Sequence, residues 1–178
     1  MRLFLAIDLP GEIKDYLFEI EKKMREAKVT WVAKKNLHLT VKFLGNVSSV
    51  RLSLVKEKIK IKHPSLDVSL GTIGFFPNKK NPKVLWISIE PEQKVILFQQ
   101  KIDEQLLSLF PNEQRFQAHI TLGRIKSVRR REEFFQSIEN IQIEPKRFTI
   151  ASFQLVKSEL KSTGPKYTTL ENVTLSKM

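Results

Sequence analysis

The sequence has 178 residues, of which 31 are Lys or Arg and 19 are Asp or Glu, so the formal net charge is +12 at pH 7. A composition with 41% hydrophobic and 28% charged residues is that of a folded globular protein and excludes disorder, collagen and coiled coil. The absence of cysteine excludes disulfides, thiolate nucleophiles and Cys-ligated metals, and the excess of basic residues predicts a polyanionic partner.

The first half of the chain predicts strands alternating with basic helices. Residues 2–9 read as a short buried strand, and Pro10-Gly11 opens a helix whose outer face carries Lys14, Glu21 and Lys22. Residues 37–44 alternate with period two, which predicts a half-buried strand. Its core face carries Leu37, Leu39, Val41 and Phe43, and its polar face carries His38, Thr40 and Lys42. A basic helix from Ser48 or Ser49 to about Lys62 comes next, then strands near 66–72 and 83–89 joined by a loop at 76–82.

The second half repeats this order. A helix is predicted over 92–110 and an alternating strand over 116–124, followed by a short basic helix over about 128–140. Strands near 147–155 and 168–175 complete the chain, with Gly164-Pro165 as a turn. Helix, histidine-bearing strand, basic helix and two strands therefore occur twice. No Pro/Gly/Ser-rich linker separates the halves, so we expect residues 1–178 to form one two-lobed domain.

The predicted fold class is α+β. The antiparallel strands are expected to line a central cleft, with helices outside and a pseudo-two-fold axis relating the similar halves. The apolar run at the N-terminus is only five residues long, and no later run reaches membrane-spanning length. We therefore expect a cytoplasmic protein with no membrane association.

Two copies of the pattern H-x-T-x carry the chemistry, and each lies in an alternating strand. They are His38-Leu39-Thr40-Val41 and His119-Ile120-Thr121-Leu122, 81 residues apart. Side chains two apart on a strand share a face, so each motif presents an imidazole beside a hydroxyl. A pseudo-two-fold axis would make the two pairs face each other across the cleft.

Two imidazoles and two hydroxyls suit a phosphoryl centre. Hydrolysis of a phosphodiester in line requires a base that takes a proton from water and an acid that protonates the departing oxygen. The unperturbed pKa of histidine, about 6.5, lets one ring be neutral and the other charged near neutral pH. The hydroxyls of Thr40 and Thr121 can donate hydrogen bonds to the non-bridging oxygens, where charge accumulates.

A single histidine on the polar face of a strand is usually only a solvated or hydrogen-bonded residue. His63, which precedes Pro64 and has no threonine two residues later, fits that plain interpretation. Two copies of H-x-T-x at the repeat distance favour function. A zinc site is a further alternative, but neither motif has the nearby acidic or thiol ligands that zinc requires, so we expect no metal.

Segments outside the motifs add to this pattern, namely Arg2–Pro10, Trp31-Val32, Asn36–Gly45, Phe76-Pro77, Val84–Trp86, His119–Arg124 and Gly164–Tyr167. With them the chain resembles, nearly end to end, the two-histidine phosphoesterases, and within these the bacterial and archaeal RNA 2′,3′-cyclic phosphodiesterases, also called 2′-5′ RNA ligases. That family has a duplicated α+β fold with a V-shaped cleft and opens a 2′,3′-cyclic phosphate to a 2′-phosphomonoester. The resemblance implies that His38 donates a proton to the 3′ oxygen, that His119 activates water, and that no cofactor is needed.

The family often has Ala at the position of Gly123, a difference expected to matter little, whereas Arg124 matches the arginine that frequently closes the second motif. Arg124 would bind the phosphate as a bidentate donor or, equally, form a surface salt bridge. Phe43 is interpreted as core packing, and Tyr167 as either a cleft residue or an ordinary strand aromatic. Contact with RNA is favoured for Arg129-Arg130-Arg131, and plain surface for Lys56, Lys58, Lys60 and Lys62.

The sequence thus predicts a monomeric hydrolase that binds RNA with a 2′,3′-cyclic phosphate end. Two alternatives remain open at this stage. The same imidazoles could serve a 2′-5′ RNA ligase or a 2′-5′ phosphodiesterase, or the cleft could be a non-catalytic module that only binds RNA ends.

Overall fold

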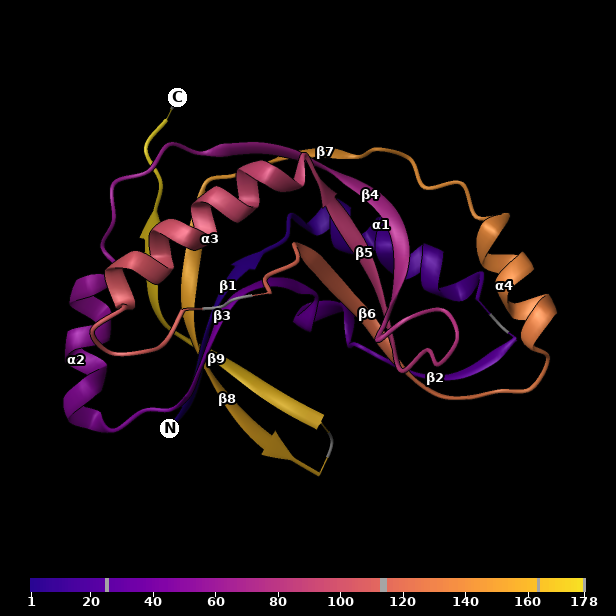
Figure 1. The fold of residues 1–178 in the computed structure, drawn as a ribbon, viewed down its shortest axis with the longest axis horizontal. Helices are drawn as coiled ribbons and strands as arrows, with labels where there is room; N and C mark the ends of the chain where they lie inside the picture. The colour runs from indigo at the N-terminus through magenta and orange to yellow at the C-terminus, as the bar shows by residue number, and fades with distance from the viewer. Residues whose placement is uncertain (25, 113–114, 163, 178) are drawn as a thin grey trace.

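The computed structural model describes residues 1–24, 26–112, 115–162 and 164–177, and it has strands and helices in the expected alternation (Figure 1). The strands are β1 (Arg2–Asp8), β2 (Ala27–Trp31), β3 (His38–Asn46), β4 (Leu66–Phe76), β5 (Val84–Glu90), β6 (His119–Val128), β7 (Arg147–Ile150), β8 (Ser152–Lys161) and β9 (Gly164–Thr174). The helices are α1 (Gly11–Lys22), α2 (Ser49–Lys58), α3 (Glu92–Leu106), α4 (Arg131–Glu139) and the 3-10 turn η1 (Lys34–Asn36).

The strands form one curled, antiparallel sheet in the order β7-β4-β5-β6-β3-β1-β8-β9, with β2 added beside β6. From its centre outward, β6, β5 and β4 mirror β3, β1 and β8, so the two lobes have the same internal order. The lobes meet where β3 pairs with β6 through Leu39 and Ile120. The corresponding helices α2 and α4 lie at opposite ends of the molecule (Figure 1). The predicted duplicated α+β architecture with helices outside is confirmed.

Several predicted boundaries were wrong. The strand β2 was not predicted, and the strand predicted at 116–124 begins only at His119 and continues to Val128. The single strand predicted near 147–155 is two strands in different lobes, because β7 pairs with β4 whereas β8 pairs with β1 and β9. Gly164-Pro165, predicted as a turn, begins β9, and Gly164 has a φ of +112° that only glycine adopts readily.

A β-bulge interrupts each histidine-bearing strand at the same place. In β3, Ala6 faces Thr40 and Leu5 faces Lys42, so Val41 is the extra residue. In β6, Trp86 faces Thr121 and Leu85 faces Gly123, which makes Leu122 the extra residue. An extra residue reverses the alternation beyond it. The residues that follow, Phe43 and Arg124, consequently share a face with the histidines.

The bulge overturns the expected roles of two residues in β3. Phe43, predicted in the core, is 66% exposed, whereas Lys42, predicted on the polar face, is 4% exposed. The buried Lys42 ammonium lies 2.6 Å from the Asp103 carboxylate of α3 and donates to the Pro111 carbonyl at 2.7 Å. Ion pairing and hydrogen bonding are what allow a charge to be buried.

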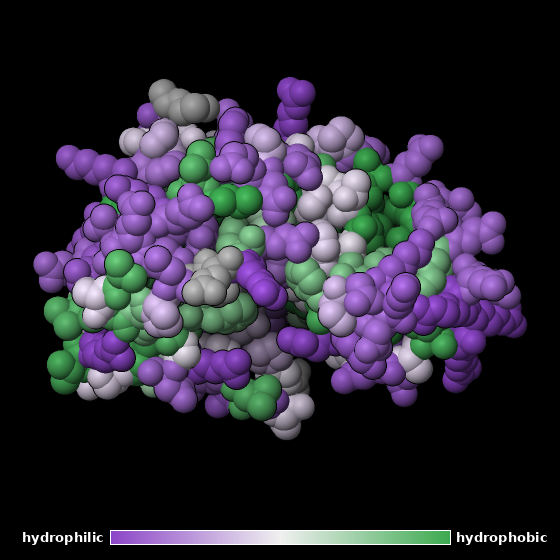
Figure 2. Space-filling model, in the orientation of Figure 1, coloured by the Kyte–Doolittle hydropathy of each residue, from purple (hydrophilic) through white to green (hydrophobic). Residues whose placement is uncertain are grey.

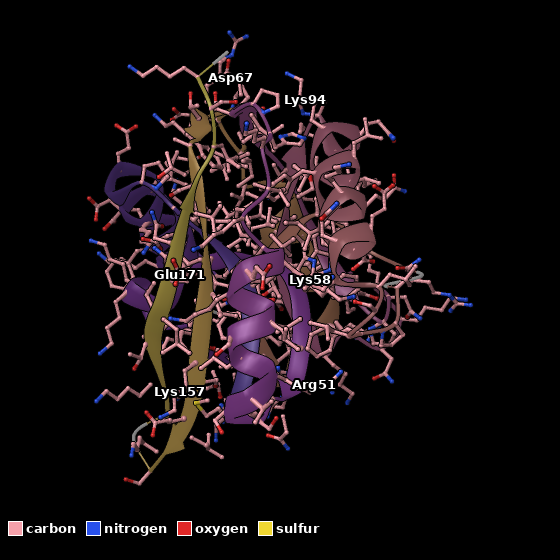
Figure 3. The ribbon with its side chains drawn as sticks, turned by 90° about the vertical axis from the view of Figure 1, so that its left-hand side faces the viewer. Arg51, Lys58, Asp67, Lys94, Lys157 and Glu171 are labelled. Atoms are coloured by element: carbon pink, nitrogen blue, oxygen red, sulfur yellow. The ribbon has the colours of Figure 1, made fainter. Side chains whose placement is uncertain are left out.

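Two side chains of α2 bind it to other segments of the chain. Arg51 donates to the Leu109 carbonyl, and its guanidinium lies 5.0 Å from the ring centroid of Phe110. On the other side, Lys56 bonds to the Leu170 carbonyl at 3.0 Å and pairs with Glu171 of β9 at 3.2 Å. Figure 3 shows Glu171 on the strand that runs beside α2. These contacts tie β9 to the lobe that carries His38.

Glu21 was predicted on the outer, charged face of α1, but it is 5% exposed and its Oε1 has no partner among the described residues. The helix turns this position toward the core beside Ile20 and Leu17. Burial raises the pKa of Glu21 to about 8 from its usual 4.5, because low-dielectric surroundings disfavour the carboxylate. Between pH 4.5 and about pH 8, the folded protein therefore holds a proton here that the unfolded chain releases.

This proton makes stability depend on pH. A pKa raised in the folded state contributes stability that is complete below pH 4.5 and is lost as pH rises toward about 8. We expect Glu21→Gln, which keeps the neutral shape, to be more stable than the parent at pH 8 and about equal to it at pH 4.5. Urea unfolding at both pH values measures this, and an equal effect of the substitution at both would contradict it.

Hydrophilic residues cover most of the face seen in Figure 2, between smaller apolar patches. Within the described residues, no helix is both long and apolar enough to cross a membrane.

Candidate active site

The first feature of the site is how the two histidines are held. His38 Nδ1 lies 2.6 Å from the Asn36 carbonyl oxygen, and His119 Nδ1 lies 2.8 Å from the Gln117 carbonyl oxygen. A carbonyl oxygen only accepts, so Nδ1 carries a proton in both rings and Nε2 is the nitrogen left for chemistry. The same bond to the residue two positions earlier occurs in both lobes. Neither carbonyl was predicted from the sequence.

The pairing of β3 with β6 brings the two motifs together. Leu39 faces Ile120 in the antiparallel register, and both of these side chains are buried. Their neighbours on the opposite face therefore lie across from one another, His38 beside Thr121 and Thr40 beside His119. His38 Nε2 also lies 3.0 Å from Thr40 Oγ1 in its own strand. All four predicted residues thus meet on one face at the junction of the lobes.

Aromatic rings pack around both imidazoles. Tyr167 of β9 meets the His38 ring edge-to-face at 5.5 Å between centroids, and Phe4 lies 5.2 Å away. In the other lobe, Phe76 lies 4.9 Å from the His119 ring and Trp86 lies 5.9 Å from it. Tyr167 therefore borders the site, as the first of its two predicted interpretations has it. Packing of this kind fixes ring orientation and removes water from the histidines.

Glycine at position 74 makes room for the Trp86 ring. A Cβ at Gly74 would lie 2.2 Å from a ring carbon of Trp86, closer than packed atoms can approach. The indole therefore lies against the backbone of β4. Phe76 and Trp86 lie in segments that carry the family resemblance, but their contact with His119 depends on the placement of β4 and β5, which the sequence did not reveal.

Arg124 lies on the face of His119 and Thr121 because of the bulge at Leu122. Its charge reaches Tyr167, since proximity to Arg124 partly offsets the rise that burial causes in the pKa of this tyrosine. Tyr167 belongs to the opposite lobe, so the charge of Arg124 acts across the junction of the lobes. Among the described residues Arg124 has no ion pair, which removes support from the salt-bridge interpretation.

Burial dominates the electrostatics of the site. It lowers the pKa of His38 and of His119 from the usual 6.5, because partial desolvation disfavours the imidazolium. Backbone hydrogen bonds to Asn36 and Gln117 act in the opposite direction on the two pKa values. The pKa of His38 is further lowered by the charge of His119, so the two rings are close enough to interact. A substrate phosphate would favour the charged forms.

The arginine run after β6 lies far from this site. Arg129 follows His119 by ten residues, roughly 30 Å along an extended strand. Arg130 pairs with Glu133 at 2.9 Å, and Arg131 donates to the Lys79 and Lys80 carbonyls. Local contacts thus account for two of the three arginines, and RNA contact by this run stays a prediction. Of the lysines in α2, Lys56 is engaged with Glu171 rather than plainly solvated.

The surroundings of Gly123, where the family often has Ala, are tight. A Cβ at Gly123 would lie 2.5 Å from Val29 Cγ1 of β2, the strand that the sequence did not reveal. An alanine here requires Val29 to shift.

Among the described residues, no group of three His, Cys, Asp or Glu side chains could hold a metal ion.

Two carbonyl-oriented imidazoles, two hydroxyls and a guanidinium thus lie on one face, a set of groups that suits the chemistry of phosphate esters. The chain also matches the profile of the family described as LigT like phosphoesterase twice, over residues 7–86 and 87–167. It belongs to this family, and each of the two matches contains one H-x-T-x motif.

Similar proteins support the assignment. The chain is 34% identical over 169 residues to the RNA 2′,3′-cyclic phosphodiesterase of Methanocaldococcus jannaschii, covering 94% of this chain and 96% of that protein. It is 32% identical to the protein of the same name from Thermotoga maritima, over 96% and 93% of the two chains. The crystal structure of E. coli LigT complexed with 3′-AMP superposes with a TM-score of 0.78 at 27% identity, covering 99% and 98%.

Proposed function

We propose that this protein hydrolyses the 2′,3′-cyclic phosphate at the end of an RNA to a 2′-phosphomonoester by acid–base catalysis without a metal ion. The observation that carries the proposal is the paired arrangement of His38 and His119, each with Nδ1 fixed by a backbone carbonyl and Nε2 on the side of the threonine hydroxyls. The relatives named RNA 2′,3′-cyclic phosphodiesterase, similar over nearly the whole chain, give the substrate class.

In the proposed mechanism the histidines act on opposite sides of the phosphorus. Neutral His119 takes a proton from water through Nε2 while the water oxygen bonds to phosphorus. The bond from phosphorus to the 3′ oxygen breaks, and charged His38 gives that oxygen the proton on its Nε2. Charge that develops on the non-bridging oxygens is stabilised by the hydroxyls of Thr40 and Thr121 and by the Arg124 guanidinium.

The proposal includes a monomer that acts in the cytoplasm. One chain supplies both halves of the site, since β3 carries one motif and β6 the other, so no second copy is needed. For the same reason we treat residues 1–178 as a single two-lobed domain. The net charge of +12 would attract an RNA end through contacts that weaken with salt.

The test is product analysis on an oligonucleotide that ends in a 2′,3′-cyclic phosphate, with and without excess EDTA. We expect a 2′-phosphomonoester and an undiminished rate in EDTA. A 3′-phosphate product would contradict the roles of the histidines, and loss of activity restored by zinc would contradict metal independence. Joining to a 5′-hydroxyl oligonucleotide, or binding without turnover, would instead support a ligase or an RNA-end-binding module.

A further inference from the structure

The duplication poses a chemical problem, because it makes the two histidines nearly equivalent. Each Nδ1 donates to the carbonyl two residues earlier, each ring packs against aromatic side chains, and each has a threonine two residues later. Acid–base hydrolysis nevertheless needs one ring to start charged and the other to start neutral. A feature that differs between the lobes must therefore decide which ring holds the proton.

The lobes differ in the charge of the residue that faces each histidine from the neighbouring strand. In the lobe of His38, β1 places Asp8 opposite the histidine. In the lobe of His119, β5 places Ser88 opposite, and Ser88 Oγ accepts from the Thr72 amide at 2.9 Å. Residues paired directly across two antiparallel strands share a face with side chains about 5 Å apart. One histidine thus faces a carboxylate, the other a neutral hydroxyl.

Charged and titratable groups from three other elements also face His38. From α1, the Lys14 ammonium lies 2.6 Å from Asp8 Oδ1, so this cation contacts the carboxylate and not the imidazole. From β9, Tyr167 stays neutral, because burial raises the pKa of its hydroxyl. From β6 comes His119 itself. Among these charges Asp8 raises the pKa of His38 more than Lys14 lowers it.

We propose that Asp8 is a positioning residue that keeps the catalytic proton on His38 and so makes His38 the acid and His119 the base. The inference rests on the proposed function only in that both histidines take part in catalysis. Asp8 touches neither substrate nor water in this role, and it acts through the charge of the ring opposite.

The proposal predicts an effect on one side of the pH profile only. The active form has His38 charged and His119 neutral. On the alkaline side, where both rings are neutral, its population depends on how tightly His38 holds a proton. On the acid side, where both are charged, it depends on how readily His119 loses one. A change at Asp8 therefore acts on the alkaline limb and leaves the acid limb unchanged, which a general structural defect does not do.

The experiment measures kcat/KM across pH for a cyclic-phosphate-ended oligonucleotide and the titration of each histidine ring by NMR. For Asp8→Asn we expect kcat/KM on the alkaline limb to fall on the order of threefold to tenfold relative to the acid limb. The His38 titration should move to lower pH. Lys14→Gln removes the opposing charge and should shift the limb ratio and the His38 titration the other way.

Asp15→Asn is the matched control. Asp15 is an exposed acid of α1 paired with Lys34. Its loss changes the net charge by the same amount as the loss of Asp8, but its carboxylate does not face His38. Equal effects of Asp8→Asn and Asp15→Asn, or a uniform loss at all pH values, would overturn the role of Asp8. Failure of the proposed function would appear separately, as full activity in His38→Ala.

Discussion

Replacing either His38 or His119 with alanine is expected to lower kcat for hydrolysis of a cyclic-phosphate-ended oligonucleotide by about 10²–10⁴-fold, the usual contribution of a positioned acid or base. The physical reason is that each ring has one nitrogen fixed by a carbonyl and only Nε2 available for proton transfer. No neighbouring side chain in the motifs can replace it, since the Thr40 and Thr121 hydroxyls do not titrate near neutral pH. Initial rates at saturating substrate measure the effect.

The double replacement distinguishes joint from separate action. Because the two rings serve one concerted step, the double variant should lose little more activity than the worse single variant. His63→Ala is the matched control, because this histidine bonds to the Pro64 carbonyl and packs against Phe98, away from the motifs. A purified His38→Ala or His119→Ala protein that is folded by circular dichroism yet fully active would contradict the two-histidine mechanism.

The sequence alone was sufficient for the motifs because they lie before the bulges. His38 and Thr40 keep the period of two, as do His119 and Thr121, so their common face followed directly from the alternation. Phe43 was misplaced because one extra residue at Val41 reverses that alternation, and nothing in the letters marks a bulge.

Asp8 and Ser88 show a second reason why part of the site escaped prediction. Their significance depends on which residue of a neighbouring strand lies opposite each histidine. Register between strands is set by tertiary packing and not by either strand alone. The same applies to Gly123, whose close packing under β2 was not foreseen because that strand was not predicted.

The two bulges give corresponding positions different chemistry. Phe43 in β3 and Arg124 in β6 both follow the reversal of alternation, so both turn toward the face of the histidines. One lobe thereby offers an exposed aromatic ring and the other a guanidinium. The residue just before each shows a matching contrast on the opposite face, with Lys42 buried in one lobe and Gly123 packed under β2 in the other.

Loss of the Lys42 ammonium is expected to lower the free energy of unfolding by several kcal/mol. Lys42 and Asp103 are 4% and 6% exposed in their side chains and 2.6 Å apart, and Lys42 also donates to the Pro111 carbonyl. Lys42→Met keeps the length and apolar bulk of the side chain but removes the ammonium that pairs with the buried Asp103 carboxylate. Breaking a buried pair in this way costs about 3–5 kcal/mol of unfolding free energy, measurable by urea denaturation at pH 7.

The double substitution Lys42→Met with Asp103→Leu tests whether the cost arises from the unbalanced charge of the Asp103 carboxylate. Removing both charges exchanges the ion pair for apolar contact, so the double variant should recover most of the stability that Lys42→Met loses. Lys101→Met is the matched control, because Lys101 pairs with Glu104 on the exposed side of α3, where an ion pair contributes little. A Lys42→Met protein within about 1 kcal/mol of the parent, or a double variant less stable than both single variants, would show that the pair does not anchor β3 to α3.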